Sequence, residues 1–232
     1  MISGRSNFND TKERIVEGFE KLVYTNVNNR WCIRLIEKNK FSKAIECLNK
    51  VIKLDPEDYA AWTFKGIALM YLENYHEAII AFNKSLEISL NARPWHYKGL
   101  CFFKLGDFEK AFKAYDKALQ IYPNYPNVWH NKGVSLENLG RHEEALKAYN
   151  ESLSINSDNF KAWYEKGVSL ENLGRHEEAL KAYNESLSIN SDNFKAWYEK
   201  GVSLENLGRH DEALESYKKS VIIKKISVNN KT

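Results

Sequence analysis

The sequence predicts an all-α protein built as a stack of short helix pairs, and three observations lead to this prediction. Residues 132–176 and 166–210 are identical, so the chain repeats itself with a period of 34 residues. Within each period, apolar residues recur at helical spacing on two successive segments. A glycine separates these segments, and a polar turn follows the second. A fixed period of this length indicates stacked modules, each burying its apolar face against its neighbours.

Residues 160–193 show the two helices of one module. Trp163, Gly167 and Leu170 are spaced by four and three residues, so they share one face of the first helix, which we call helix A. Gly174 can adopt the left-handed conformation that ends a helix, and a second amphipathic helix, helix B, follows it. Because Gly167 has no side chain, we expect the two backbones to approach there, with Trp163 and Tyr183 filling the space around it.

The ends of these helices carry polar residues that fit helix capping. Residues 190–193 supply turn and N-cap groups before the next helix A. Glu177 and Glu178 lie in the first turn of helix B, where the helix dipole favours negative charge without any acid–base role. Three corner histidines recur one repeat apart, at His142, His176 and His210. A separation of roughly 10 Å between stacked helices is too wide for them to share a metal ion.

This pattern resembles the tetratricopeptide repeat, which has W-x2-L-G-x2-Y, then A-x3-F, then P within 34 residues. Residues 92–125 match it best, at Trp95, Gly99, Phe102, Gly106, Ala111, Tyr115, Ala118 and Pro123. Lysine replaces the preferred leucine at Lys98, Lys132, Lys166 and Lys200, and serine replaces proline at Ser157 and Ser191. We expect each lysine stem to lie on its repeat with the charge in water. The resemblance spans residues 25–227 and implies a right-handed superhelical solenoid of antiparallel helix pairs.

The repeat pattern also divides the chain. Residues 1–24 are expected to form a polar N-terminus and a capping helix over residues 11–24, the alternative being a loosely attached tail. Six repeats follow at 25–58, 59–91, 92–125, 126–159, 160–193 and 194–227, and 228–232 form a tail. The first repeat is degenerate, with Trp31 and Cys32 at the usual Trp and Gly positions. The second carries Glu73 in place of glycine and is one residue short before Ala92, which predicts a tight junction there.

Composition agrees with a soluble repeat array, and the pattern of the three cysteines adds the expectation that the protein is cytoplasmic. Hydrophobic residues make up 43% of the chain and charged residues 28%, and no signal peptide is expected. No apolar stretch approaches the ~18 residues that a membrane helix needs. The net charge of +3 is too small to indicate nucleic acid. We therefore expect no membrane, nucleic-acid, metal or cofactor partner.

The three cysteines do not form a C-x-x-C motif or an even-numbered framework. Cys32 and Cys47 fall on helix A and helix B of one repeat, so a disulfide or a redox pair is conceivable. The interpretation preferred from the sequence is that they, like Cys101, are small buried apolar residues in a reducing compartment.

The tetratricopeptide resemblance implies a concave groove, lined by helix A, that receives a peptide or a partner's helix. The expected groove residues are Phe64, Ile67, Tyr71, His96, Tyr97, Leu100, Phe103, His130, Asn131 and Val134. For the apolar members, coverage by the N-terminal repeat is the open alternative. Further along, Lys161 with Glu165 and Lys195 with Glu199 have i, i+4 spacing and are interpreted as exposed ion pairs worth ~0.2–0.5 kcal/mol each.

No catalytic motif is found, and the sequence therefore predicts a non-catalytic scaffold for protein–protein interaction. The family's clamp for acidic C-terminal peptides of heat-shock chaperones is not expected, since Thr63, Ile67, Tyr97 and Asn127 occupy its places. Two other functions stay open: a regulatory or substrate-recognition part of an enzyme complex, and an RNA-binding helical repeat.

The C-terminal end departs from the repeat. Turn residues are replaced by isoleucine and lysine after residue 221, so we expect the last helix B to run on. It would present an apolar surface for end-to-end self-association through Val221, Ile222, Ile223 and Ile226. The alternatives are a frayed terminus or a chain cut short of its cap.

Overall fold

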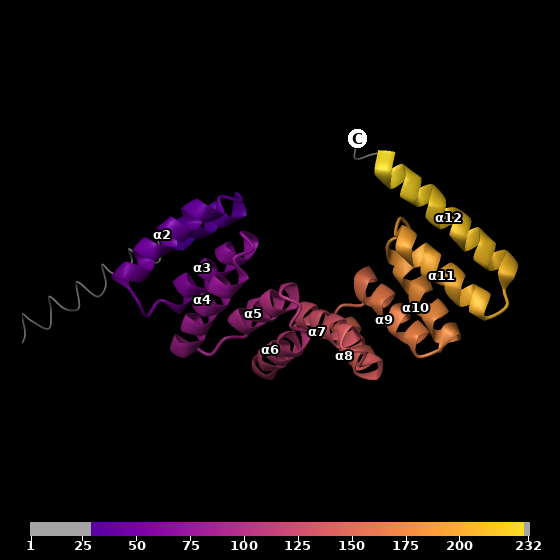
Figure 1. Ribbon diagram of the computed structural model, residues 1–232, viewed down its shortest axis with the longest axis horizontal. Helices are drawn as coiled ribbons and strands as arrows, with labels where there is room; N and C mark the ends of the chain where they lie inside the picture. The colour runs from indigo at the N-terminus through magenta and orange to yellow at the C-terminus, as the bar shows by residue number, and fades with distance from the viewer. Residues whose placement is uncertain (1–28, 230–232) are drawn as a thin grey trace, which may run out of the picture. The chain divides into compact units, whose positions relative to one another are not determined.

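The structure, a computed structural model, describes residues 29–229 (Figure 1). The capping helix predicted over residues 11–24 lies outside this range. Within it, the chain is helical and contains no strand. A first helix spans residues 29–37. The helices that follow are α2 (Phe41–Leu54), α3 (Tyr59–Tyr71), α4 (Tyr75–Ile88), α5 (Ala92–Lys104), α6 (Phe108–Ile121), α7 (Pro126–Asn138), α8 (His142–Ile155), α9 (Phe160–Asn172), α10 (His176–Ile189), α11 (Phe194–Asn206) and α12 (His210–Asn229).

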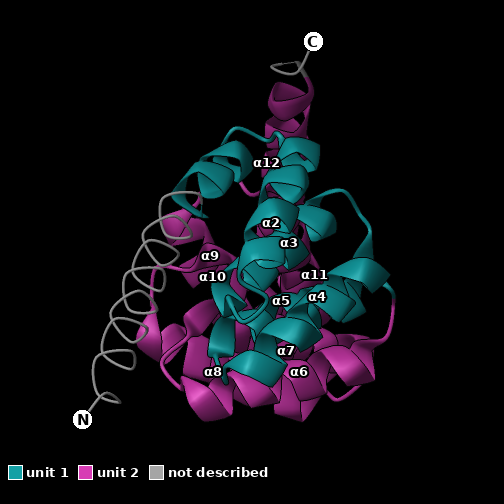
Figure 2. Ribbon diagram, turned by 90° about the vertical axis from the view of Figure 1, so that its left-hand side faces the viewer, with its two compact units in different colours: residues 1–105 teal, residues 106–232 magenta. Residues whose placement is uncertain are grey.

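The protein forms two compact units, Met1–Leu105 and Gly106–Thr232, which Figure 2 shows in two colours. In each unit, neighbours along the chain pack side by side, as α3 does with α4 and α9 with α10. The odd-numbered helices α3 to α11 are the predicted helices A, and the even-numbered ones are helices B. Successive helices A also touch directly, α3 with α5 in the first unit and α7 with α9 and α9 with α11 in the second. This confirms the predicted all-α array of helix pairs.

Helix A ends where a residue takes the left-handed conformation. Gly174 has φ +71°, which confirms the predicted stop. Glu73 stands at the equivalent place with φ +63°, so a residue with a side chain is held in a conformation that usually costs roughly 1–2 kcal/mol. The polar turn behaves as expected, because the Asn193 side chain accepts a hydrogen bond from the amide of Ala196 and caps α11.

The core of each pair is organised around the helix A glycine. A Cβ on Gly167 would lie 2.4 Å from a ring atom of Tyr183, whose side chain is fully buried. The predicted close approach is therefore confirmed. Trp163 lies at the edge of this core rather than inside it, since it is only partly buried and its indole N–H donates to the Ser157 carbonyl at 2.8 Å. Lys166 lies on its repeat as predicted, but its charge is not left in water. The ammonium lies 4.9 Å from the Trp163 ring centre, and burial lowers its pKa.

The junction before Ala92 is tight, as the missing residue predicted. Three residues separate α4 from α5, whereas four separate α6 from α7. The tight turn has a consequence for Trp95. Other helix A tryptophans donate to a carbonyl six residues earlier, as Trp129 does to Pro123 at 2.8 Å, but the indole nitrogen of Trp95 is buried and has no such partner.

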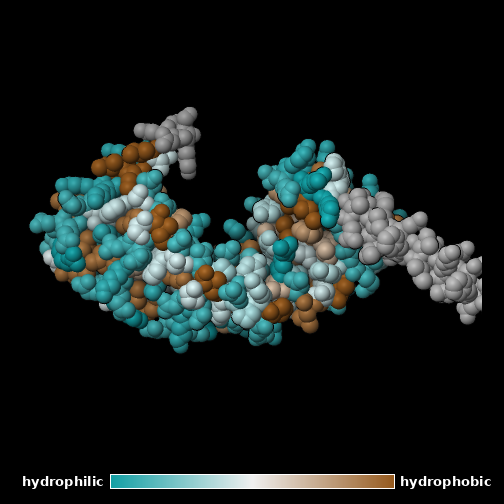
Figure 3. Space-filling view, turned by 180° about the vertical axis from the view of Figure 1, so that it is seen from behind, coloured by the Kyte–Doolittle hydropathy of each residue, from teal (hydrophilic) through white to brown (hydrophobic). Residues whose placement is uncertain are grey.

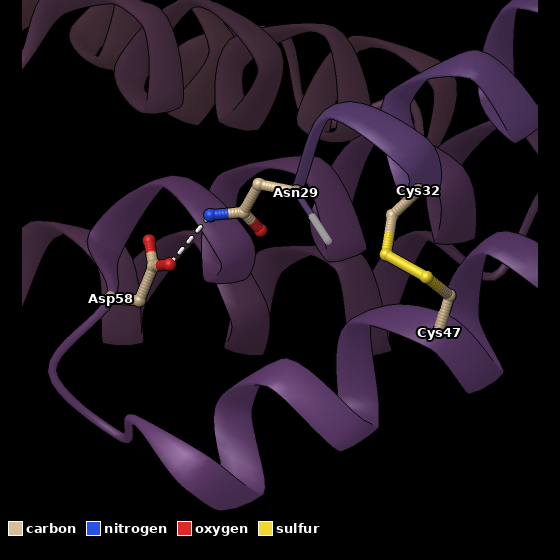
Figure 4. Close-up of a disulfide and its surroundings, with 4 residues drawn as sticks. All are labelled: Asn29, Cys32, Cys47 and Asp58. Carbon is tan, nitrogen blue, oxygen red and sulfur yellow. Dashed lines mark hydrogen bonds between the residues drawn. A yellow bond between two sulfur atoms is a disulfide. The ribbon is translucent and has the colours of Figure 1, made fainter. Parts of the chain in front are cut away.

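Cys32 and Cys47 form a disulfide, which corrects the preferred interpretation from the sequence (Figure 4). They are 15 residues apart in the chain, and the antiparallel packing of helix 29–37 on α2 brings their Cα atoms to 5.7 Å. Next to it, the Asn29 side chain donates to Asp58 at 2.6 Å, which ties the first helix to the N-cap of α3. Cys101 is a free, buried thiol, as expected, and burial raises its pKa to about 12.

The last helix extends beyond the repeat, as predicted. α12 has 20 residues, whereas α10 has 14. Its first part keeps the register of the repeat, because Ser220 donates to the Phe194 carbonyl just as Ser186 donates to that of Phe160. None of the helices within residues 29–229 combines the length and apolar character that crossing a membrane requires.

Candidate partner-binding surface

The expected groove residues of the first unit differ in how much surface they offer. Ile67 and His96 are buried, with 6% and 8% of their surface exposed. Phe64 is half-buried and packs against the core around Cys32 and Leu48. The N-terminal repeat therefore covers Phe64, which is what the alternative reading of the sequence described.

Aromatic stacking fixes two other residues of this set. Tyr71 is 55% exposed, and its ring stacks on Phe41 of α2 with centres 4.9 Å apart. Tyr97 is half-buried and stacks on Phe82 and His96, at 6.0 and 5.2 Å. Leu100 and Phe103, one and two turns further along α5, are half-buried as well. This face of α5 thus offers a row of partly exposed apolar side chains on a rigid helix.

A pocket of about 350 Å³ lies between the first turns of α3 and α5. Phe64 and Pro94 give it apolar walls, and Tyr59, Asn91 and Arg93 add polar groups. The sequence predicted the tight junction before Ala92 but not that Asn91 and Pro94 line a pocket there, because the pocket depends on how α3 and α5 pack. A second pocket, of about 550 Å³, lies on the first helix pair. Its lining includes Trp31, Arg34, Lys38, Lys40, Lys43, Lys50 and a single acidic residue, Glu46, so it favours anionic over cationic groups.

In the second unit the expected residues lie on α7. The His130 ring packs against Tyr149 with centres 5.8 Å apart, and its Nδ1 atom is buried without a hydrogen-bond partner. Burial, helped by the charge of Lys161, lowers the pKa of His130 to about 4, so the ring is neutral at physiological pH. Asn131 and Val134 are half-buried beside it.

A glutamate at the end of each helix A binds the next repeat. Glu137 accepts hydrogen bonds from the Ser169 hydroxyl and, at 3.3 Å, from the Asn172 amide, both on α9. Its carboxylate also lies 3.0 Å from Nδ1 of His142 on α8. Glu171 repeats this arrangement with Ser203, Asn206 and His176. These two carboxylates therefore connect successive helices A.

Glu165 and Glu199 behave differently from the sequence-based expectation. The i, i+4 ion pairs with Lys161 and Lys195 are not formed within the described part of the chain, and the Lys161 ammonium lies instead 5.9 Å from the Phe160 ring centre. Burial, followed by the charge of Glu137, raises the pKa of the Glu165 carboxyl, which Lys195 partly opposes. Burial and then Glu171 raise the pKa of Glu199. The expectation was wrong because both carboxylates turn into the helix A surface, away from the lysine one turn before.

Profiles of known families identify the repeat. A tetratricopeptide repeat profile matches residues 33–94 and 130–194, which together are more than half of the chain. The chain belongs to the tetratricopeptide repeat family. Other tetratricopeptide repeat profiles match residues 92–125 and 182–215. No curated protein matches the chain.

Solved structures share this tetratricopeptide repeat fold. A structure from the functional characterization of Pseudomonas aeruginosa pilF is 16% identical, with a TM-score of 0.75 over 85% of this chain and 90% of that one. YrrB, described as a TPR protein with an unusual peptide-binding site, is 22% identical, with a TM-score of 0.70 over 77% and 93%. MamA is 21% identical, with a TM-score of 0.68 over 71% and 96%. At these identities the similarity concerns the fold.

The last tetratricopeptide repeat ends in an exposed apolar surface on α12. Val221, Ile222 and Ile226 are 52%, 56% and 56% exposed, and Ile223 is half-buried. In Figure 3 an apolar patch lies on α12 beside the C-terminal residues. Leu214 is also 52% exposed, although its counterpart Leu180 is buried. The surface that a following repeat would cover is therefore open.

Proposed function

We propose that this tetratricopeptide repeat protein is a non-catalytic scaffold that binds a peptide or a helix of another protein along its helices A. The observation that carries this proposal is the row of half-buried side chains on α5 formed by Tyr97, Leu100 and Phe103. The pocket of mixed polar and apolar lining at the first turns of α3 and α5 lies at the start of the same helix. Partly exposed aromatic and aliphatic side chains on a rigid frame are the usual anchors of a protein interface. The peptide-binding site named for YrrB, a protein of the same fold, is consistent with this use.

Site-specific photo-crosslinking tests the proposal. A photoreactive phenylalanine analogue replaces Tyr97 or Leu100 in the full chain, and Ile80 on α4, which is 59% exposed, serves as the control position. We expect a discrete protein adduct from the two α5 positions and none from the control. Tyr97→Ala with Leu100→Ala, checked for its fold by circular dichroism, should weaken capture of the same protein at least about tenfold. Equal adducts from Ile80 would show that the partner binds elsewhere.

We also propose that two copies of the chain associate end to end through Val221, Ile222, Ile223 and Ile226. The open surface of α12 supports this, since its exposed isoleucines and valine lie where a further repeat would pack. Light scattering after size exclusion should give a mass that rises with micromolar protein concentration. Ile222→Ser with Ile226→Asp should return the monomer, whereas a monomer at every concentration for the unchanged chain would refute the proposal.

A further inference from the structure

The pocket of about 550 Å³ on the first helix pair is lined mainly by positive charge, and we call it the basic pocket. Its only acidic lining residue is Glu46, against five cations. All five cations are exposed, and none of them forms an ion pair within residues 29–229. The five are Arg34, Lys38, Lys40, Lys43 and Lys50.

The lysines at the start of α2 replace an opposite-charge pair of the later repeats. In α8 the N-cap residue Arg141 donates two hydrogen bonds of 2.7 Å to the Glu144 carboxylate. The same pair recurs in α10 and α12, and α6 carries it with the signs exchanged. In α2, Lys40 is the N-cap residue and Lys43 stands three residues later, so two like charges occupy the places of an ion pair. The charge of these lysines is therefore left without a counter-charge.

Arg34 stands where the other helices A carry a small buried residue. In α9 this residue is Ser169, which is fully buried and donates to Glu137 of the preceding repeat. The position therefore faces the preceding repeat. A further repeat stacked on this face would bury the Arg34 charge, which is costly without a partner. The face is thus suited to an anionic ligand rather than to another repeat. The equivalent residues elsewhere, each 0% exposed, are Ala68, Cys101, Ser135 and Ser203.

The disulfide holds the two helices of the basic pocket together. Arg34 lies on helix 29–37, whereas Lys43 and Lys50 lie on α2. The Cys32–Cys47 bridge joins these two helices, and Cys47 is itself part of the lining. The cations are thus carried on a cross-linked frame before any ligand binds. Such pre-organisation lowers the entropy cost of binding.

Trp31 adds apolar surface among these charges. It lines the basic pocket and is 57% exposed. Tryptophan is one of the residues that contribute most to binding when a partner covers it. A ligand with carboxylates and an aromatic or aliphatic side chain would contact both the cations and the indole, whereas a small inorganic anion would use the cations alone.

The charge pattern favours an acidic peptide over a nucleic acid. A single strand binds in a positive groove that follows its backbone over several nucleotides. Beyond the first helix pair this positive charge is not continued, because α4 has Glu77 in its first turn and the cations at the start of α6, α8 and α10 are paired with carboxylates. A volume of about 550 Å³ suits a short ligand segment.

We propose that the basic pocket binds an acidic segment of a partner protein. Carboxylates of the segment pair with Arg34 and Lys43 on the two helices, and an aromatic or aliphatic side chain of the segment packs on Trp31. The inference rests on the proposed scaffold function only in that the ligand belongs to another protein. The anchor row on α5 is not part of this site.

Fluorescence anisotropy with a labelled peptide, Gly-Glu-Asp-Phe-Asp-Glu-Gly, tests the inference on the full chain. Arg34→Ala with Lys43→Ala should raise the Kd at least about tenfold. The matched control is Lys147→Ala with Lys181→Ala, which removes the same charge from exposed positions of α8 and α10. It should change the Kd less than about twofold. Equal weakening by both pairs would show attraction by net charge alone and would overturn the inference.

A second variant separates binding from folding. Lys43→Glu rebuilds in α2 the opposite-charge arrangement of α8, and a carboxylate in the first turn favours the helix. It should therefore leave the helix content intact by circular dichroism and still weaken the peptide more than Lys43→Ala does. Lys181→Glu is the control for the charge reversal. Unchanged affinity in Lys43→Glu would refute the site.

A double-mutant cycle examines the contact with Trp31. Replacing phenylalanine by alanine in the peptide should weaken binding several-fold to the unchanged chain and have no effect on Trp31→Ala. The same loss with both chains would show that the phenylalanine does not pack on Trp31, and the proposed role of the indole would be wrong.

Other occupants of the basic pocket give different results in the same assay. Oligouridine that binds more tightly than the peptide, and is lost in Arg34→Ala with Lys43→Ala, would reassign the site to nucleic acid. The N-terminal segment of the chain carries three glutamates, and Glu13→Gln with Glu17→Gln and Glu20→Gln should leave the Kd unchanged. Several-fold tighter peptide binding by that variant would make this segment the occupant. Either result, or no saturable binding up to about 1 mM peptide, would overturn the inference.

The outcome is separable from that of the proposed function. Tyr97→Ala with Leu100→Ala should not change the Kd for the acidic peptide. If the native partner cross-links from α5 but the acidic peptide does not bind, the scaffold function stands and this inference fails. If the peptide behaves as expected but no adduct forms at α5, the basic pocket stands and the proposed anchor row fails.

Discussion

The repeats 160–193 and 194–227 are identical over their first 17 residues, share Leu and Tyr at matching positions of helix B, and have different environments. Leu180 in α10 is 6% exposed, whereas Leu214 at the same position of α12 is 52% exposed. Tyr183 is fully buried with an unpartnered hydroxyl, whereas Tyr217 is partly exposed and donates to Glu205. α11 follows α10 and packs against it, while no helix in the described part of the chain covers α12. In a module of this kind, the burial of a side chain and its hydrogen bonds therefore depend on the module that follows.

The largest expected effect tests this dependence on the neighbour. Leu180→Ala should lower the free energy of unfolding by about 2–5 kcal/mol, because it opens a cavity against Leu204 and Ala213 of the following repeat. Leu214→Ala, the same change at the same position, should cost under about 1 kcal/mol. Guanidinium unfolding followed by circular dichroism measures both. Equal losses of unfolding free energy in the two variants would mean that the stability of a repeat does not depend on the repeat that follows it.

The second test compares the two units through the disulfide. Cys32→Ser with Cys47→Ser removes a bridge that closes a loop of 15 residues, and should lower the stability of the first helix pair by about 3 kcal/mol. Hydrogen exchange by mass spectrometry should show loss of protection in α2 with no change in α9 and α10. The direct control is alkylation of the purified chain with its natural cysteines, denatured without a reducing agent. One reactive thiol, that of Cys101, is expected, and three would contradict the bridge.

The smallest effect concerns the ends of helices A. Glu73→Gly should stabilise the first unit by about 1 kcal/mol, since glycine adopts the positive φ at this position without strain. Gly174→Ala, at the equivalent place in the second unit, should destabilise by a similar amount. Thermal unfolding should give a higher Tm for Glu73→Gly and a lower Tm for Gly174→Ala than for the unchanged chain. A loss of stability in Glu73→Gly would mean that the Glu73 side chain makes a stabilising contact.

The sequence by itself determined the local features of this protein. The helix pairs, the left-handed stop at Gly174, the cap by Asn193, the lysine over Trp163 and the extension of α12 all depend on residues within a few positions of one another. Local conformational preferences and i, i+3 or i, i+4 contacts specify such features, and a sequence records them directly. The 34-residue period then gave the family, because a pattern repeated along the chain is specific where a single match is not.

Only the tertiary structure decided what each of these faces offers to a partner. It paired Cys32 with Cys47 and buried Ile67 and His96. It also turned Glu165 away from Lys161. The Tyr183 hydroxyl has no hydrogen-bond partner, whereas the equivalent Tyr217 hydroxyl donates to Glu205. Each of these outcomes depends on side chains from another helix, up to a full repeat away in the sequence. Identical stretches of this chain differ in exposure and hydrogen bonding because burial is set by the atoms that pack against a residue, and sequence periodicity does not record where the stack of neighbours ends.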